Sequence, residues 1–282
     1  MGKNRETAGI GARTWRAGYR LLCALIYLFL CLPILIIIPM SFNAEAFFTF
    51  TRDMLMLKPS GFSLRWYEAF FSDPMWMAAF RNSVYIAVLT TMLSVSLGTL
   101  AAIGLSRAST PFRSSIMALM ISPLVVPVII TGAGVFFFYS SIGMTGTFAA
   151  IVLSHTVLAT PFVVLTITAT LSGFDRELLH ASASLGAPPH TTFFRITVPL
   201  IRPGVISGAF FAFIVSFDEV VVVLFLAGSE QRTVPRQMWS GIRDTMQPTI
   251  LAVASVLVVL SLLFLLLIEA LRRRGARLQG RL

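Results

Sequence analysis

Two apolar runs of the chain are joined by the polar interval Asp175–Gly204, DRELLHASASLGAPPHTTFFRITVPLIRPG. It is the longest polar interval between apolar runs in the second half of the sequence. The pattern over Glu177–Leu185 predicts one short helix, which Gly186 ends because glycine readily adopts the left-handed conformation found after a helix C-terminus. Pro188 suits the first turn of a second helix, and we expect Pro199 to end that element before the next apolar run. The interval therefore predicts an ordered hairpin.

The composition indicates a membrane protein. Of the 282 residues, 56% are hydrophobic and only 12% are charged, whereas a typical soluble domain has about 25% charged residues. Crossing a bilayer takes about 20 apolar residues. Six stretches qualify, at 21–40, 83–105, 114–139, 147–171, 204–227 and 249–270. We therefore expect an all-α integral membrane protein with six transmembrane helices in one domain, 21–270, between a cytoplasmic N-terminal segment, 1–20, and a basic cytoplasmic tail, 271–282.

The distribution of basic residues predicts the orientation. A net charge of +10 could indicate nucleic-acid binding, but the Lys and Arg residues lie at the ends of apolar runs, where they determine membrane topology. With the N-terminus inside, 15 of the 22 basic residues fall in inner segments and 7 in outer segments. We expect both termini and the loop 173–203 to face the cytoplasm. The first apolar run is too long for a cleaved signal peptide and is interpreted as an anchor.

Prolines lie inside two of the predicted spans. Pro123 and Pro127 are in the third and Pro161 is in the fourth, and none of them can donate a backbone hydrogen bond to a helix. Broken spans are tolerated where protein or a water-lined cavity satisfies the freed carbonyls. We expect these spans to be interrupted and to line or gate a path. His155, in the fourth span, is interpreted as a hydrogen-bond partner between helices, with a proton relay as the alternative.

Two adjacent acids, Asp218 and Glu219, lie within the fifth apolar run. Placing an Asp at the centre of a span costs about 2.5–3.5 kcal/mol, so the pair needs a partner, a water-filled cavity or protonation. Three hypotheses remain open: attraction of a cationic solute, a proton relay, and capping of, or pairing with, outer arginines. The candidate arginines are Arg232, Arg236 and Arg243. Because neighbouring helical residues point about 100° apart, we place Asp218 toward the path in preference to Glu219.

Aromatic residues precede the acids on the same run. Phe213 and Phe217, with Phe210 one turn earlier, are candidates for an apolar constriction of a solute path. Ordinary packing between helices is the alternative interpretation, because phenylalanine on a helix face most often packs.

The sequence lacks the usual signatures of metal, redox and ATPase chemistry. Cys23 and Cys31 both lie in the first apolar run without a metal-binding spacing, and the three histidines form no metal or nucleophile motif. Neither lysine, Lys3 or Lys58, belongs to a phosphate-binding GxxxxGK[ST] motif. We expect no catalytic residue, no metal site and no cofactor in this chain, so energy for transport has to come from another chain.

The interval Asp175–Gly204 resembles the EAA loop of permease subunits of ATP-binding-cassette (ABC) importers. That pattern is Glu-Ala-Ala, three residues, Gly, nine residues, then Ile-x-Leu-Pro. Here His180-Ala181-Ser182 stands in for Glu-Ala-Ala, and Gly186, Ile196, Val198 and Pro199 follow at matching spacing. His180 replaces the family acid and Val198 replaces Leu, while Glu177 lies one turn earlier. The resemblance implies that the loop docks in a groove of an ATPase subunit through Glu177, His180, Ala181, Ser182, Gly186, Ile196 and Pro199.

The resemblance extends over most of the chain. The stretches FSLRWYEAF (62–70), SFDEVVVVLFLAG (216–228) and RTVPRQMWSGI (232–242) are similar to the spermidine/putrescine branch of these permeases. This implies a type I importer permease (MetI-like) fold, crossing a bacterial inner membrane several times. It also implies a second homologous permease subunit, two ATPase subunits that bind ATP and Mg, and a periplasmic or extracellular solute-binding protein. The implied solute is a polyamine. Another small organic solute, such as GABA or an opine, is an alternative, and a proton-coupled secondary transporter is an alternative from another class.

Overall fold

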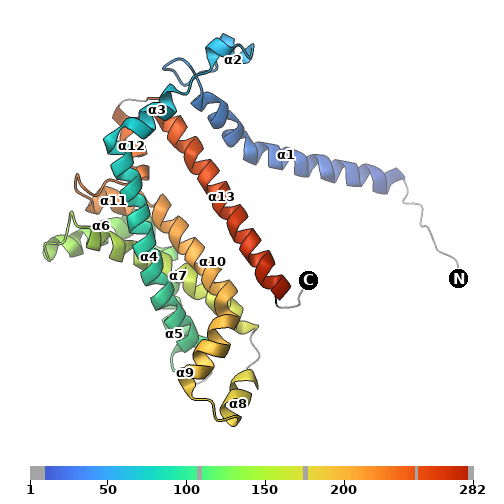
Figure 1. The fold of residues 1–282 in the computed structure, drawn as a ribbon, viewed down its shortest axis with the longest axis vertical. Coiled ribbons are helices and arrows are strands. Elements are labelled where there is room, and N and C mark those ends of the chain that lie inside the picture. Colours follow the sequence, from blue (N-terminus) through green and yellow to red (C-terminus); the bar gives the residue numbers. More distant parts are fainter. Residues whose placement is uncertain (1–9, 107–109, 174–176, 245–246, 279–282) are drawn as a thin grey trace. The chain divides into compact units, whose positions relative to one another are not determined.

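The computed structural model describes residues 10–106, 110–173, 177–244 and 247–278 (Figure 1). The described chain is almost entirely helical; outside the helices there is an isolated antiparallel bridge between Asn43 and Phe62. The all-α prediction is confirmed. The described residues fall into two compact units, within Met1–Ser72 plus Met246–Leu267 and within Asp73–Thr245 plus Ile268–Leu282.

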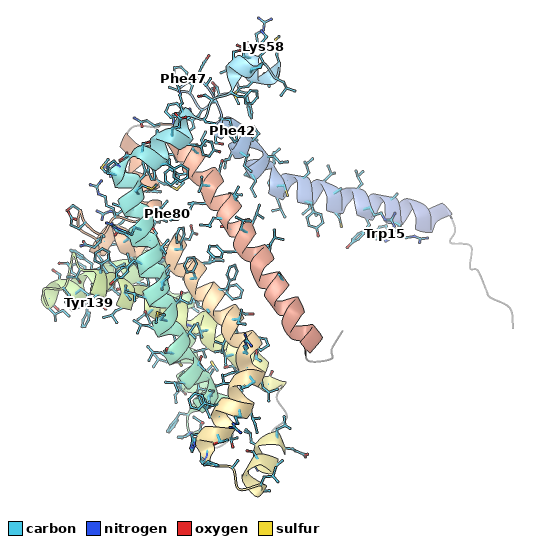
Figure 2. All side chains as sticks on the ribbon, in the orientation of Figure 1. Trp15, Phe42, Phe47, Lys58, Phe80 and Tyr139 are labelled. Atoms are coloured by element: carbon cyan, nitrogen blue, oxygen red, sulfur yellow. The ribbon has the colours of Figure 1, made fainter. Side chains whose placement is uncertain are left out.

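The first unit contains α1 and three short elements, together with most of α13. Their bounds are α1 Ile10–Ser41, α2 Arg52–Leu55, a 3-10 turn Pro59–Gly61, α3 Arg65–Ser72 and α13 Thr249–Leu278. The loop after α1 is tied to α3, because the indole of Trp66 donates a hydrogen bond to the carbonyl of Asn43 at 2.8 Å. The apolar window of α1 has no buried residue, and its side chains, Trp15 among them, project outward along its length (Figure 2).

The second unit contains the remaining helices, α4 to α12. They are α4 Pro74–Ser106, α5 Arg113–Val125, α6 Val128–Ser141, α7 Phe148–Ser172, α8 Glu177–Ser184, α9 Pro189–Thr192, a π-helical turn Phe193–Thr197, α10 Val198–Asp218, α11 Val221–Leu226 and α12 Val234–Asp244. Figure 1 shows α8 and α9 at the opposite end of this unit from α12.

Five described helices are long and apolar enough to cross a membrane. They are Trp15–Ser41, Pro74–Ser106, Phe148–Ser172, Pro189–Asp218 and Thr249–Leu266. The pair α5 and α6 passes the same test together but is bent by 102°, which gives six spans if the pair is one span. The third predicted span is therefore broken, as expected, between Val125 and Val128. Pro127 is the N-cap residue of α6.

The expected interruption of the fourth span at Pro161 is wrong. The helix α7 runs without a break from Phe148 to Ser172. Proline removes one backbone hydrogen bond, and the turns on both sides of it are fixed by buried side chains such as Leu158 and Val163. Packing on both sides is sufficient to keep this helix continuous.

The prediction that Pro199 ends its element is also wrong. The helical chain continues from Pro189 to Asp218. The turn before the proline is π-helical, with the N–H of Val198 bonded to the carbonyl of Phe193. Such wide turns accommodate a local fault in the ladder of hydrogen bonds, so the helix passes the proline ring without ending.

The core of the second unit is formed by α4, α7 and α10, which pack against one another. Small residues permit this close approach: Ala102, Ala159 and Ala212, one from each helix, are fully buried. A Cβ atom at Gly208 of α10 would lie 2.8 Å from Thr166 Oγ1 and 3.2 Å from Val163 Cα. Helix interfaces in membranes typically use small residues in this way, because van der Waals packing drives the association.

We predict that Gly208→Ala destabilises the protein by about 1–3 kcal/mol, because the added methyl group overpacks the contact with α7. The matched control is Gly134→Ala in α6, where a Cβ atom meets nothing within 4 Å. The thermal midpoint of the purified protein in detergent is the measurement. Equal midpoints for the two variants would show that the close contact between α7 and α10 is incorrect.

Candidate solute path and coupling loop

The two acids of the fifth apolar run lie at a break between helices. The helix α10 ends at Asp218, Glu219 has extended backbone angles of −71° and 119°, and α11 begins at Val221. The prediction of one continuous span over 204–227 is therefore wrong. A new helix leaves its first N–H groups without partners, and here the carboxylate of Glu219 accepts from the N–H of Val222 at 2.9 Å. An acid placed directly before a valine run is the sequence signal for this cap.

The structure separates the environments of the two acids. Asp218 is exposed, whereas Glu219 is half-buried and bonded to α11. In the parts of the chain that the structure describes, the ion pair found is Lys58–Asp53 at 3.4 Å, and neither acid of the break pairs with an arginine. Of the open hypotheses, capping of, or pairing with, outer arginines finds no support in these residues. Glu219 instead caps the N-terminal end of α11.

Arg236 caps the other end of α11. Its Nη1 donates to the carbonyls of Ala227 at 2.9 Å and Gly228 at 2.8 Å. Partial burial lowers the pKa of the Arg236 guanidinium from its usual value, and repulsion by Arg232 adds to this. A half-buried cation needs compensating acceptors, and the carbonyls at the C-terminal end of a helix carry partial negative charge.

The segment that carries Arg236 is fixed to the start of α4. The side-chain amide of Asn82 donates to the carbonyls of Glu230 at 2.8 Å and Arg232 at 3.0 Å, and the N–H of Val234 donates to Ser83 Oγ at 2.8 Å. All of these contacts join residues about 150 positions apart. The sequence contains no signal for them, because Asn82 and Ser83 belong to a long helix and their partners are backbone atoms.

Two further contacts hold α11 in place. The N–H of Gly146 donates to the carbonyl of Leu226 at 2.8 Å. On α6, a Cβ atom at Gly132 would lie 2.9 Å from the ring of Phe225, so α6 and α11 approach closely. Together with the two caps, these contacts fix a helix of only six residues.

The remaining candidates of the fifth run lie on α10. Phe213 and Phe217 are half-buried and stack on each other, with ring centroids 5.7 Å apart and planes at 18°. They share one face of α10 directly before Asp218. Their role as a constriction stays a prediction.

His155 links α7 to α10. Its ring is buried, and Nδ1 lies 2.9 Å from Ser216 Oγ, two residues before Asp218. The prediction of a hydrogen-bond partner between helices is confirmed. Among the described residues, the other ring nitrogen, Nε2, has no hydrogen-bond partner.

The polar interval forms the hairpin expected from its sequence. The helix α8 is followed by Gly186, whose φ is +75°. The N–H of Gly186 donates to the carbonyl of Ala183 at 2.9 Å and the N–H of Ala187 to that of Ser182 at 3.1 Å. This pair of bonds is a Schellman motif. Pro189 begins α9, with Pro188 as its N-cap residue, so the second helix is confirmed as well.

Residues of the EAA-like pattern divide between the inside and outside of this hairpin. Ser182 is buried and its Oγ lies 2.6 Å from Thr192 Oγ1, which ties α8 to α9. His180, Ala181, Gly186 and Pro199 are exposed, and Ile196 is half-buried. Glu177 and His180 are exposed on the face of α8 that a 100° helical step places opposite Ser182.

The fold defines a class of protein, a helical membrane protein with several spans. Comparison with known proteins identifies its family. Residues 94–277 match the family of the binding-protein-dependent transport system inner membrane component, and the chain belongs to this family. Its place is therefore the inner membrane, as predicted.

Curated relatives agree over most of the chain. The spermidine/putrescine transport system permease protein PotC of Haemophilus influenzae is 30% identical over 89% of this chain and 94% of its own length. The putrescine transport system permease protein PotI of Escherichia coli is 32% identical over 86% of each chain. A probable molybdenum ABC transporter permease of Haloferax volcanii is 34% identical over 69% of this chain and 75% of its own.

Solved structures support the fold. A chain of a bacterial ABC transporter for alginate has a TM-score of 0.72 at 12% identity, and the match covers 93% of this chain and 98% of that one. A chain of the MetNI methionine ABC transporter has a TM-score of 0.54 at 18% identity, over 73% and 97%. The predicted type I importer permease fold is confirmed.

Proposed function

We propose that this chain is the permease subunit of an ATP-driven importer for a polyamine-like cation of the spermidine or putrescine type. Membership of the family supports the importer class and sets aside the proton-coupled secondary transporter. The relatives named for spermidine and putrescine align with more of this chain than the relative named for molybdenum does. This favours a polyamine among the solutes of the family.

The observation that carries the proposal is the exposed carboxylate of Asp218 at the C-terminal end of α10. The end of a helix carries about −0.5 elementary charge on carbonyls that have no partner further along the helix. The opposite, positive end of α11 is covered by the Glu219 carboxylate. The break therefore has net negative character, and an ammonium group leaving water needs such oxygen acceptors.

The coupling loop 173–203 is the proposed contact with an ATPase subunit. Its tip is ordered by the Schellman motif, and Leu185 at that tip is 87% exposed. An apolar side chain presented on a fixed turn suits insertion into a groove of another protein. In this proposal Glu177, His180, Ala181, Ser182, Gly186, Ile196 and Pro199 form or support the docking surface, on the cytoplasmic side with both termini.

Motion of this loop reaches the acid through one rigid element. The helical chain from Pro189 to Asp218 is continuous, so it spans about 45 Å at about 1.5 Å per residue. In the complete importer, two ATPase subunits would hold ATP and Mg, a second permease subunit would form the other half of the path, and a binding protein would deliver the solute from outside. Closure of the ATPases would then move the loop and Asp218 together.

We predict that Asp218→Asn lowers the uptake of putrescine by at least about tenfold, since a hydrogen bond to a charged group is worth about 1.5–3 kcal/mol. The measurement is ATP-dependent uptake by the complete importer in proteoliposomes. Glu68→Gln, which removes a charge from an exposed position outside the break, is the matched control and keeps normal uptake. Normal uptake by a folded Asp218→Asn variant would contradict the proposed cation path.

We predict that Gly186→Val uncouples ATP hydrolysis from the solute. A side chain at φ +75° is strained by about 1–2 kcal/mol, although the space around it is open, so the turn rather than the packing is disturbed. Gly186→Asn is the control, because Asn tolerates this conformation. The measurement is the stimulation of ATPase activity by binding protein and solute. Full stimulation of ATPase activity in the Gly186→Val variant would contradict the docking role of the hairpin.

A further inference from the structure

We infer that the two adjacent acids have different tasks: Asp218 contacts the solute, while Glu219 is a positioning residue that acts together with Arg236. These two residues cap opposite ends of α11 and so fix the break at which Asp218 lies. The assignment of Asp218 rests on the proposed function. The capping role of Glu219 and Arg236 rests on geometry alone.

The helix α11 is too short to be stable on its own. Helices of fewer than about 12 residues are marginal without tertiary support, and α11 has six. Its N-terminal end is bonded to a carboxylate, with Glu219 Oε1 at 2.9 Å from the N–H of Val222. At its C-terminal end, the guanidinium of Arg236 donates to the carbonyls of Ala227, the C-cap residue, and of Gly228, the residue after it. Each charge has the sign that stabilises the helix end beside it.

Arg236 is itself held in place by the core of the unit. The segment before it is fixed to α4 by Asn82 and Ser83, at 2.8–3.0 Å. Gln231 adds a bond within the segment, since its Oε1 accepts from the N–H of Gly228 at 3.0 Å. A continuous set of contacts therefore runs from α4 through Arg236 and α11 to Glu219, and α4 belongs to the core of this unit.

These contacts also determine the position of Asp218. The carboxylate of Glu219 is occupied by the helix end, and the two residues are adjacent in the chain. Fixing Glu219 therefore fixes the backbone from which Asp218 projects. Asp218 has neither a hydrogen bond nor an ion pair within the described ranges, and its side chain is exposed. It remains the acid whose oxygens are available to a cation.

An isosteric substitution separates capping from charge recognition. Glu219→Gln keeps an accepting oxygen at the same position and loses the charge, whereas Glu219→Ala loses both. If Glu219 positions α11, the Gln variant rescues most of what the Ala variant loses. If Glu219 attracts the cation directly, the Gln variant behaves like Asp218→Asn.

The test has two arms, both on the complete importer. The first is amide hydrogen exchange over Val221–Leu226 without solute. We expect exchange to accelerate at least about tenfold in Glu219→Ala and in Arg236→Ala, and to change less than about fivefold in Glu219→Gln, which loses only the charge. Arg232→Ala removes a charge from an exposed neighbour without uncapping α11 and is the matched control. Unchanged exchange in Glu219→Ala, or equal acceleration in Arg232→Ala, would overturn the capping role.

The second arm is the rate of putrescine uptake at saturating binding protein and solute. We expect Glu219→Gln to keep at least about half of the wild-type rate, and Glu219→Ala, Arg236→Ala and Asp218→Asn to lose about tenfold or more. A loss in Glu219→Gln as large as that in Asp218→Asn, with normal exchange, would overturn the division of tasks. If the wild-type importer moves no polyamine, the proposed solute is wrong, and the exchange arm still decides the capping role.

Discussion

The bilayer requires that every backbone N–H and C=O inside it finds a partner within the protein. The break between α10 and α11 is one of two places where a span of the second unit departs from a continuous helix, and its hydrogen bonds provide partners for backbone groups at both ends of α11. Glu219 serves the N-terminal end of α11, while Arg236 and the N–H of Gly146 serve its C-terminal end. Because the Glu219 carboxylate is bonded to α11, the carboxylate of Asp218 is the one at this break that is available to bind a cation.

The rest of the unit gives this break a rigid frame. The helices α4, α7 and α10 pack through alanines and glycines, and the bond between His155 and Ser216 joins α7 to α10 half a turn before Asp218. The same α10 continues without interruption into the coupling hairpin at the other end of the unit. One rigid element thus connects the proposed ATPase contact with the proposed solute contact, which is the mechanical requirement for coupling ATP hydrolysis to transport.

The sequence predicted the features that depend on local chemistry. Apolar length located the spans, and Gly186 with the two prolines after it predicted the hairpin correctly, because a positive φ and a helix start impose strict residue preferences.

Two other prolines were misjudged. Pro161 and Pro199 each remove one hydrogen bond, and packing or a π-helical turn compensates for it, which a sequence does not reveal. The side chain of Asn82 donates to backbone carbonyls about 150 positions further along the chain, so no local sequence pattern predicts these bonds. The sequence signal for the break at Glu219 is weak: it is an acid followed by four valines. The structure shows its meaning, because the Glu219 carboxylate caps the helix that the valines begin.

Asp218 lies on the proposed path of a cation, and a thiol beside it tests this proposal directly. The two cysteines of the chain, Cys23 and Cys31, are free and can be replaced by serine, after which Ile214→Cys, at an exposed position one turn before Asp218 on α10, carries the single thiol of this subunit and leaves Asp218 in place. In the assembled importer, the rates of modification by a cationic and an anionic methanethiosulfonate reagent are measured with and without putrescine. We expect faster modification by the cationic reagent, because the end of α10 carries partial negative charge, and slower modification when putrescine is transported. Equal rates for the two reagents, or rates indifferent to putrescine, would contradict the proposed path.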